Sequence, residues 1–358
     1  MSTMTIKELA SICGVAVSTV SRAMNDRSDV NPATRDRIRA AAAEHGYVPN
    51  ASAQRLKISA TQTISVIIQG EMGQLLIEVL EHLERLFGEA GYETTLTHIA
   101  KRQANAATVE RIVRGGKFSG VVFLGRYGAA DREASSLLGR RLADLDLPMV
   151  FCTTADYSGA SALHSSVSVD DHAGVYELTR HLLDNGHRRI GFVGAGSQHD
   201  REHAWALRLS GYHAALDQAG ISPEDGWVVP SVIGDGLYTM ANGYESVRDW
   251  LDARSGELPV TALIAVSDAA AVGASRALSE AGLHVPDDCS LVGFDGLDIA
   301  RYYVPRITTL AQPIPEIAES TARVLLNILR TPGRSLEQVW IRGRVVQGES
   351  VRTLDAAA

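Results

Sequence analysis

The sequence predicts a small all-α helix-turn-helix head followed by a larger α/β body of two lobes. Residues 1–60 contain eight basic and five acidic residues, a net charge of +3, whereas the remainder carries −11. From residue 63 onward, short apolar runs alternate with helical stretches, which is typical of parallel sheets covered by helices. About 300 residues of this pattern exceed one hydrophobic core, so we expect two lobes.

Composition excludes several classes of protein. The chain has 358 residues, is 45% hydrophobic and carries a net charge of −8, which does not fit a mainly disordered chain. It has no run of 18 uncharged apolar residues and no basic segment followed by an apolar one at its start, so we expect no membrane span, no secretory signal and a cytoplasmic location. Its three cysteines form no CxxC pair, which argues against a disulfide framework or a zinc finger.

The head begins with a helix start signal. Residues 5–8 form a capping box, in which Thr5 accepts a backbone N–H and Glu8 reaches back to the Thr5 N–H. Gly14 is the expected turn residue, and a second short helix is expected over 17–24. The apolar face of the first helix consists of Ile6, Leu9, Ala10 and Cys13. This is the spacing of a helix-turn-helix unit, whose second helix enters the major groove of DNA.

A third helix is expected to start at Asn31-Pro32, a capping side chain followed by proline at the first helical position. Ile38 and the alanines 41–43 supply its apolar side, and Gly46 ends it. Spacing alone leaves open a three-helix bundle with another role.

The head resembles the LacI/GalR family of bacterial transcriptional regulators. The matching motifs are Thr5-Ile6-Lys7-Glu8-Leu9-Ala10, Gly14-Val15, Ser18-Thr19-Val20-Ser21-Arg22, Asn25, Gly46-Tyr47-Val48-Pro49-Asn50 and Ala53-Gln54-Arg55-Leu56. The resemblance implies a head over 1–49, a hinge helix and linker over 50–61, and an effector-binding and dimerisation body over 62–358. It also implies double-stranded operator DNA of pseudo-palindromic sequence as partner, and a homodimer.

The resemblance also implies roles for individual head residues. Val17, Ser18 and Arg22 occupy positions that read base edges, and Arg22 can make a bidentate contact to guanine. The expected contacts to the phosphate backbone come from Thr5, Ser21, Asn25, Thr34 and Tyr47. For Ser21 and Thr34, helix capping or plain exposure is the alternative.

Residues 50–56 resemble the hinge helix of the family. Asn50 is a plausible N-cap, and Ala53 and Leu56 keep the family spacing. Leu56 resembles a leucine that is wedged into a minor-groove base step, where unstacking is offset by extra contacts to bent DNA. The alternative is a linker in which Leu56 only packs on the body.

The resemblance implies that the body has two lobes similar to those of periplasmic sugar-binding proteins. We expect the first lobe over about 62–164 plus 312–340 and the second over about 165–311 plus 341–358. A helix is expected over 74–90. Strands are expected over 64–68, 92–99, 119–124, 148–153, 189–193, 262–266 and 290–294. In such sheets, ligands bind outside the carboxyl ends of the strands.

The resemblance places an effector, expected to be a carbohydrate, between the lobes. The positions carried over are Gln69, Thr153, Arg208, Ser267, Asp295 and Gln312. Carboxylates accept pairs of hydroxyl hydrogen bonds and arginine donates to hydroxyl oxygens, which suits a polyol. A loop cap is the alternative for Asp295, and a surface salt bridge is the alternative for Arg208.

Two departures from the family pattern prevent transfer of a particular ligand. The chain has Gly70-Glu71-Met72-Gly73-Gln74 where many relatives have an aromatic pair, and Ser267-Asp268 where many have Asn-Asp. The first departure removes a flat apolar wall for a sugar ring, and Glu71 and Gln74 favour a polar ligand.

The sequence therefore predicts a transcriptional regulator, specifically a repressor, rather than an enzyme. Two other classes of protein fit the sequence less well. A solute-binding protein for transport would need a signal peptide, and a DNA-binding α/β enzyme would need a nucleophile with its base, or a metal set. The sequence shows no GxSxG elbow, and His199 and His203 lack the HExxH pattern and a third ligand. The glycines of 191–196 fit a strand and a tight turn rather than a dinucleotide loop. We expect no cofactor and no metal.

Overall fold

The computed structural model describes most of the body and part of the head. The described residues are 6–16, 19–20, 23, 31–44, 62–100, 106–125, 139–145, 147–154, 163–196, 204–224, 226–233, 237–331 and 335–354. The chain divides into two compact units, Met1–Thr61 and Gln62–Ala358. Among the described residues, no helix is both long and apolar enough to cross a bilayer.

The first unit contains helices α1 (Ile6–Ile12) and α3 (Pro32–Glu44). Asn31 caps α3, because its Oδ1 accepts the Ala33 N–H at 2.9 Å, as the sequence predicts. The small core of this unit consists of Leu9, Ala10, Cys13, Val20, Ala23, Ile38 and Ala42. The predicted apolar face of the first helix is confirmed for Leu9, Ala10 and Cys13, while Thr5 and most of the expected second helix lie outside the described residues.

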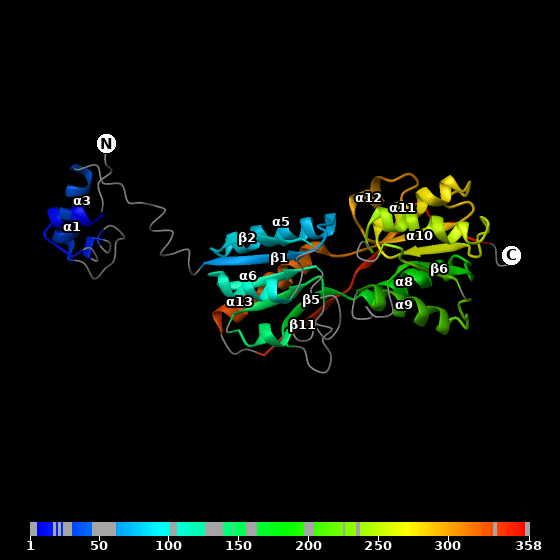
Figure 1. Cartoon of the computed structure of the whole chain (residues 1–358), viewed down its shortest axis with the longest axis horizontal. Coiled ribbons are helices and arrows are strands. Elements are labelled where there is room, and N and C mark those ends of the chain that lie inside the picture. The colour runs from blue at the N-terminus through cyan, green and yellow to red at the C-terminus, as the bar shows by residue number, and fades with distance from the viewer. Residues whose placement is uncertain are drawn as a thin grey trace. The chain divides into compact units, whose positions relative to one another are not determined.

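The first lobe of the body is a parallel sheet of order β11-β5-β4-β3-β1-β2, with helices on both faces (Figure 1). Its strands are β1 (Thr63–Gln69), β2 (Glu93–Ile99), β3 (Gly120–Leu124), β4 (Met149–Cys152), β5 (Ser165–Val169) and β11 (Gln338–Ile341). Its helices include α5 (Gln74–Glu89), α6 (Ala106–Gly115) and α13 (Ile314–Arg330).

Strand alternation explains why this sheet is covered on both faces. On β1, Ile64, Val66 and Ile68 pack in one core with α5 and α13, whereas Ile67 packs in a second core with Val109 of α6. Successive side chains of a strand point to opposite faces, so a strand that is apolar at nearly every position is buried twice.

The second lobe is a sheet of order β12-β10-β9-β8-β6-β7, parallel except where β12 pairs with β10. Its strands are β6 (Ile190–Ala195), β7 (Val228–Pro230), β8 (Ala262–Ala265), β9 (Ser290–Asp295), β10 (Thr308–Ala311) and β12 (Arg344–Val346). Its helices are α8 (Asp171–Asp184), α9 (Ala204–Gln218), α10 (Met240–Asp252), α11 (Asp268–Glu280) and α12 (Asp298–Tyr302).

Glycines let α10 and α11 approach closely. A Cβ on Gly273 would lie 1.9 Å from the backbone oxygen of Met240, and one on Gly243 would lie 2.0 Å from that of Ala270. These distances are far below any real Cβ contact, so the helix spacing requires glycine at both positions.

The order of the strands moves one lobe boundary. The predicted second lobe starts at about 165, but β5 (Ser165–Val169) lies in the first sheet between β4 and β11. The second lobe therefore begins after β5, and α8 is its first element. The chain passes from one sheet to the other after β5, after β10 and after β11.

Candidate functional site

Of the predicted DNA-contacting residues, Thr34 lies within the described part of the chain. It is half-buried in the first turn of α3, and its alternative role as the helix cap is wrong because Asn31 occupies that position. The other predicted positions lie outside the described residues: Thr5, Val17, Ser18, Ser21, Arg22, Asn25, Tyr47, Asn50, Ala53 and Leu56.

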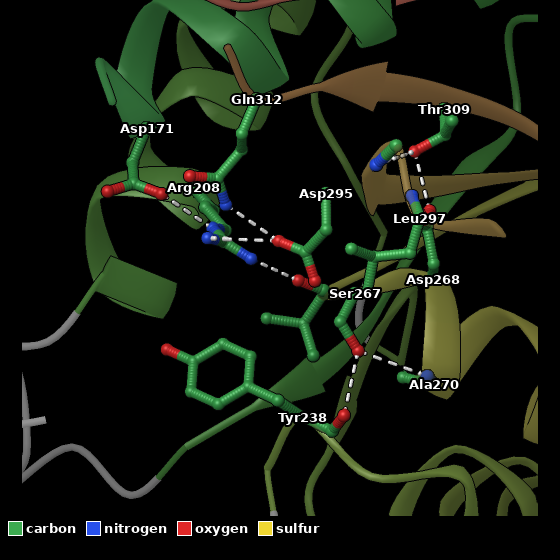
Figure 2. A network of polar contacts seen from close by, with 12 residues as sticks. Asp171, Arg208, Tyr238, Ser267, Asp268, Ala270, Asp295, Leu297, Thr309 and Gln312 are labelled. Carbon is green, nitrogen blue, oxygen red and sulfur yellow. Dashed lines mark hydrogen bonds and ion pairs between the residues drawn. The ribbon is translucent and has the colours of Figure 1, made fainter. Parts of the chain in front are cut away.

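Arg208 is the centre of a buried polar network in the body (Figure 2). Its Nε donates to Asp171 Oδ1 at 2.7 Å, and its Nη2 lies 3.9 Å from Asp295 Oδ1. Nη1 donates to the backbone oxygen of Val266, and the guanidinium carbon lies 3.7 Å from the centroid of the Phe294 ring. Since Arg208 is only 5% exposed, the alternative of a surface salt bridge is wrong.

The fold brings these side chains together from distant parts of the sequence. Asp171 begins α8 just after β5, and Arg208 lies on α9. The two helices pack closely because Gly211 has no side chain; a Cβ there would lie 2.2 Å from the backbone oxygen of His172. Asp295 ends β9 in a strained conformation, with a φ of 123°.

Gln312 holds both ends of Asp295. It follows β10, the strand paired with β9, and its backbone N–H donates to the Asp295 oxygen at 2.9 Å. Its side-chain Nε2 donates to Asp295 Oδ1 at 2.7 Å. Two of the predicted effector residues thus contact each other directly, and Arg208 forms an ion pair with one of them.

Burial and the mutual attraction of the charges shift the pKa values of this network in opposite directions. It raises the pKa of Asp171, although the charge of Arg208 opposes the change. It raises the pKa of Asp295 too, against the same guanidinium and the hydrogen bond from Gln312. For Arg208, burial alone would lower the pKa, but the charges of Asp171 and Asp295 outweigh it and raise the value.

Ser267 and Asp268 lie beside this network at the start of α11. Ser267 Oγ accepts the Ala270 N–H at 3.0 Å and donates to the Tyr238 backbone oxygen at 3.0 Å, so this predicted effector residue caps a helix. Asp268 accepts the Leu297 N–H at 2.8 Å, and its pKa is raised, first by burial and second by the charge of Asp295.

Several buried polar atoms near strand ends have no hydrogen-bond partner among the described residues. They are Thr153 Oγ1, Gln312 Oε1 and Trp205 Nε1. Thr153 follows β4 with a φ of 59°, and Gln69, also buried, ends β1 at the same edge of the first sheet. A buried polar atom without a partner costs about 1–3 kcal/mol, so each of these atoms is a candidate for a hydrogen bond to a polar ligand.

The sequence did not identify three residues in or beside the network: Asp171, Asp268 and Phe294. Asp171 and Asp268 each follow a buried strand and begin a helix. The predicted residues Asp295 and Gln312 also lie at the carboxyl ends of strands. That pattern could have identified Asp171 and Asp268. The arrangement is one of fixed hydrogen-bond donors and acceptors. Among the described residues, no group of three His, Cys, Asp or Glu side chains could hold a metal ion.

Comparison with known proteins identifies the family. A family model described as "Bacterial regulatory proteins, lacI family" matches residues 5–50, and one described as "Periplasmic binding protein-like domain" matches residues 179–351. The chain is 31% identical over 334 residues to the HTH-type transcriptional regulator MalR of Clostridium butyricum, covering 93% of this chain and 95% of that protein.

Two solved structures share the architecture. The lac repressor dimer bound to operator and the anti-inducer ONPF superimposes with a TM-score of 0.77 at 22% identity, covering 98% of this chain and 100% of that one. The complex of transcriptional regulator CelR with cellobiose gives 0.69 at 25% identity, covering 97% and 99%. The predicted fold class is confirmed, and the curated relatives are transcriptional regulators rather than enzymes. The chain belongs to the lacI family of bacterial regulatory proteins.

Proposed function

We propose that this chain is a sequence-specific transcriptional repressor that acts in the cytoplasm as a homodimer and is controlled by a carbohydrate effector. The observation that carries the proposal is the buried network of Arg208, Asp171, Asp295 and Gln312 in the body of a lacI family chain. The network supplies a receptor for a polar small molecule, and the family supplies the DNA-binding head.

The head recognises a pseudo-palindromic operator in this proposal. One head reads one half-site, and two heads of a dimer read half-sites about one helical turn, roughly 34–36 Å, apart. The residues assigned to base edges are Val17, Ser18 and Arg22, and Leu56 is the minor-groove wedge. Contacts to the phosphate backbone are assigned to Thr5, Ser21, Asn25, Thr34 and Tyr47. Asn50 and Ala53 belong to the hinge helix that carries Leu56.

The chemistry of the network favours a neutral, hydroxyl-rich effector. Asp295 retains the lone pairs of Oδ2 and Arg208 retains N–H groups of Nη1 and Nη2, so together they can accept from and donate to sugar hydroxyls. The unpartnered Gln312 Oε1 and Thr153 Oγ1 add two more groups of the same kind. The CelR structure is a complex with cellobiose, which supports a carbohydrate as the class of effector. No cofactor is assigned.

Two experiments with the full-length protein test the proposal. In the first, a pool of random duplex DNA is selected on the protein, and we expect enrichment of one pseudo-palindromic sequence. Equal binding across the pool would contradict operator recognition. In the second, thermal unfolding is followed with glucose, ribose, sucrose and cellobiose. A sugar at 100 times its Kd stabilises the folded state by about 2.7 kcal/mol.

The sugar experiment also separates a sensor from an enzyme. We expect a raised midpoint with the sugar recovered unchanged. Conversion of the sugar to a product would favour the alternative of an enzyme that carries a DNA-binding head.

A further inference from the structure

Leu297 follows a strand of the second lobe, but its side chain belongs to the core of the first. It is the last residue of the β9–α12 turn, which we define as Asp295, Gly296 and Leu297. Its side chain is 6% exposed and lies in the hydrophobic cluster that contains Ile314 and Ile317 of α13. Leu297 therefore forms an apolar contact from one lobe into the other.

The backbone of the β9–α12 turn is fixed by the second lobe. The Leu297 N–H donates to Asp268 Oδ2 at 2.8 Å, and the Gly296 N–H donates to Thr309 Oγ1 at 3.3 Å. The Thr309 hydroxyl in turn donates to Asp268 Oδ1 at 2.5 Å. The turn is thus attached by hydrogen bonds to the start of α11 and to β10, both elements of the second lobe (Figure 2).

The same turn carries the residue assigned to effector binding. Asp295 is two residues before Leu297, and its carboxylate contacts Gln312 and Arg208. Gly296 between them has a φ of 78°, and a Cβ on it would lie 2.4 Å from Ala311 Cα. The turn therefore has neither steric room at Gly296 nor an unbonded N–H at Gly296 or Leu297, which leaves it little freedom to absorb a displacement of Asp295.

We propose that Leu297 is a positioning residue that couples the hydrogen bonding of Asp295 to the separation of the two lobes. The inference deepens the proposed function and rests on it only for the role of Asp295 in effector binding. Leu297 touches no ligand in this scheme. It holds the first lobe to the turn, and the turn reports the state of the Asp295 carboxylate.

The distance between the lobes can be measured without effector or DNA. Spin labels are placed on Glu84→Cys in α5 and Ser279→Cys in α11, two exposed positions on different lobes. The described native cysteines, Cys13, Cys152 and Cys289, are all buried. Labelled protein is diluted with unlabelled protein so that each dimer carries one labelled chain, and the distance distribution is recorded by pulsed electron paramagnetic resonance.

We expect Leu297→Ala to broaden the distribution and shift it to longer distance. Leu183→Ala is the matched control, because Leu183 is also 6% exposed but packs within the second lobe. It should lower stability and leave the distribution of the parent unchanged. If Leu297→Ala fails to fold, Leu297→Val should give a smaller shift in the same direction.

Coupling is tested by adding Asp295→Ala. It should shift the distribution in the parent and cause no further shift in the Leu297→Ala background. An unchanged distribution in the Leu297 variants, or additive effects of the two substitutions, would overturn the proposal. Either result stands apart from the DNA and sugar experiments, so failure of this inference and failure of the proposed function are distinguishable.

Discussion

Replacement of Arg208 by methionine tests whether the buried network is held together by charge. The substitution keeps an unbranched side chain of similar length but removes the only cation that the described residues place beside Asp171. Asp171 is 1% exposed and Asp295 is 8% exposed, so both carboxylates are left away from water without their partner.

The distances set the size of the expected effect. At an effective dielectric constant of about 20, two unit charges 2.7 Å apart attract by roughly 6 kcal/mol, and a pair at 3.9 Å by roughly 4 kcal/mol. Desolvation of the three groups offsets much of this. Removing one partner of a buried pair costs about 3–5 kcal/mol, which is the loss expected for Arg208→Met at pH 7.

The loss should also depend on pH. The pKa of Asp171 is already raised by burial, and it rises further without Arg208. When a carboxyl group has a higher pKa in the folded state than in the unfolded state, the protein loses stability as the pH rises above the pKa of the unfolded state. The reason is that the group ionises more readily in the unfolded state. The deficit of Arg208→Met should therefore be smaller at pH 5 than at pH 7.

Urea unfolding followed by tryptophan fluorescence measures both effects. All four tryptophans lie in the body, and Trp205, Trp227 and Trp250 belong to the core of the second lobe. The double variant Asp171→Leu/Arg208→Met should recover most of the loss, since an apolar pair can replace a buried ion pair. Two results would contradict this prediction: a free energy of unfolding of Arg208→Met within about 0.5 kcal/mol of wild type, or a double variant that is no more stable than Arg208→Met.

Three further predictions concern the packing of α10 on α11, the carboxyl group of Asp268 and the hinge residue Leu56. Gly273→Ala should cost more than about 2 kcal/mol by urea unfolding, because α10 and α11 must separate, whereas Gly88→Ala meets nothing within 4 Å and should be neutral or stabilising by up to about 1 kcal/mol. Asp268→Asn should gain stability relative to wild type as pH rises above about 4, since the raised pKa of Asp268 penalises its ionisation in the folded state; a pH-independent difference in urea midpoint would contradict this. Leu56→Ala should weaken binding to selected operator DNA more than binding to random duplex, and equal loss on both would remove the wedge.

Most of the strands that the sequence predicts are apolar on both faces, although the mostly exposed β2 is predicted as well. β1, β3, β8 and β9 are runs of Val, Ile, Leu and Phe, and their expected ranges agree with the structure within a residue or two. β5 escaped prediction because it reads Ser165-Ser166-Val167-Ser168-Val169. Its serine side chains can be buried because they form hydrogen bonds: Ser165 Oγ accepts the Glu337 N–H at 3.1 Å, and Ser166 bonds to Gln338. Both partners lie about 170 residues later in the sequence. The sequence around β5 gives no indication of these partners.

The candidate site divides in the same way. Asp295 and Gln312 were predicted from the resemblance to the LacI/GalR family. Asp295 ends a strand that the sequence predicts, where the strand-end rule places ligands, whereas β10, the strand before Gln312, was not predicted. The partnership of Arg208 with Asp171 depends on the packing of α9 on α8, which the sequence did not reveal. Ser267 was predicted to face the effector, but its hydroxyl hydrogen bonds satisfy a helix cap and a backbone carbonyl.

The central claim is that a small molecule in the body controls how tightly the head holds DNA. The most direct measurement is a fluorescence anisotropy titration of the selected duplex, with and without the sugar that raises the thermal midpoint. We expect the sugar to change the Kd for DNA by roughly 5–150-fold in wild type, and to leave the Kd of Asp295→Ala unchanged. A wild-type Kd that is the same with and without bound sugar would contradict it.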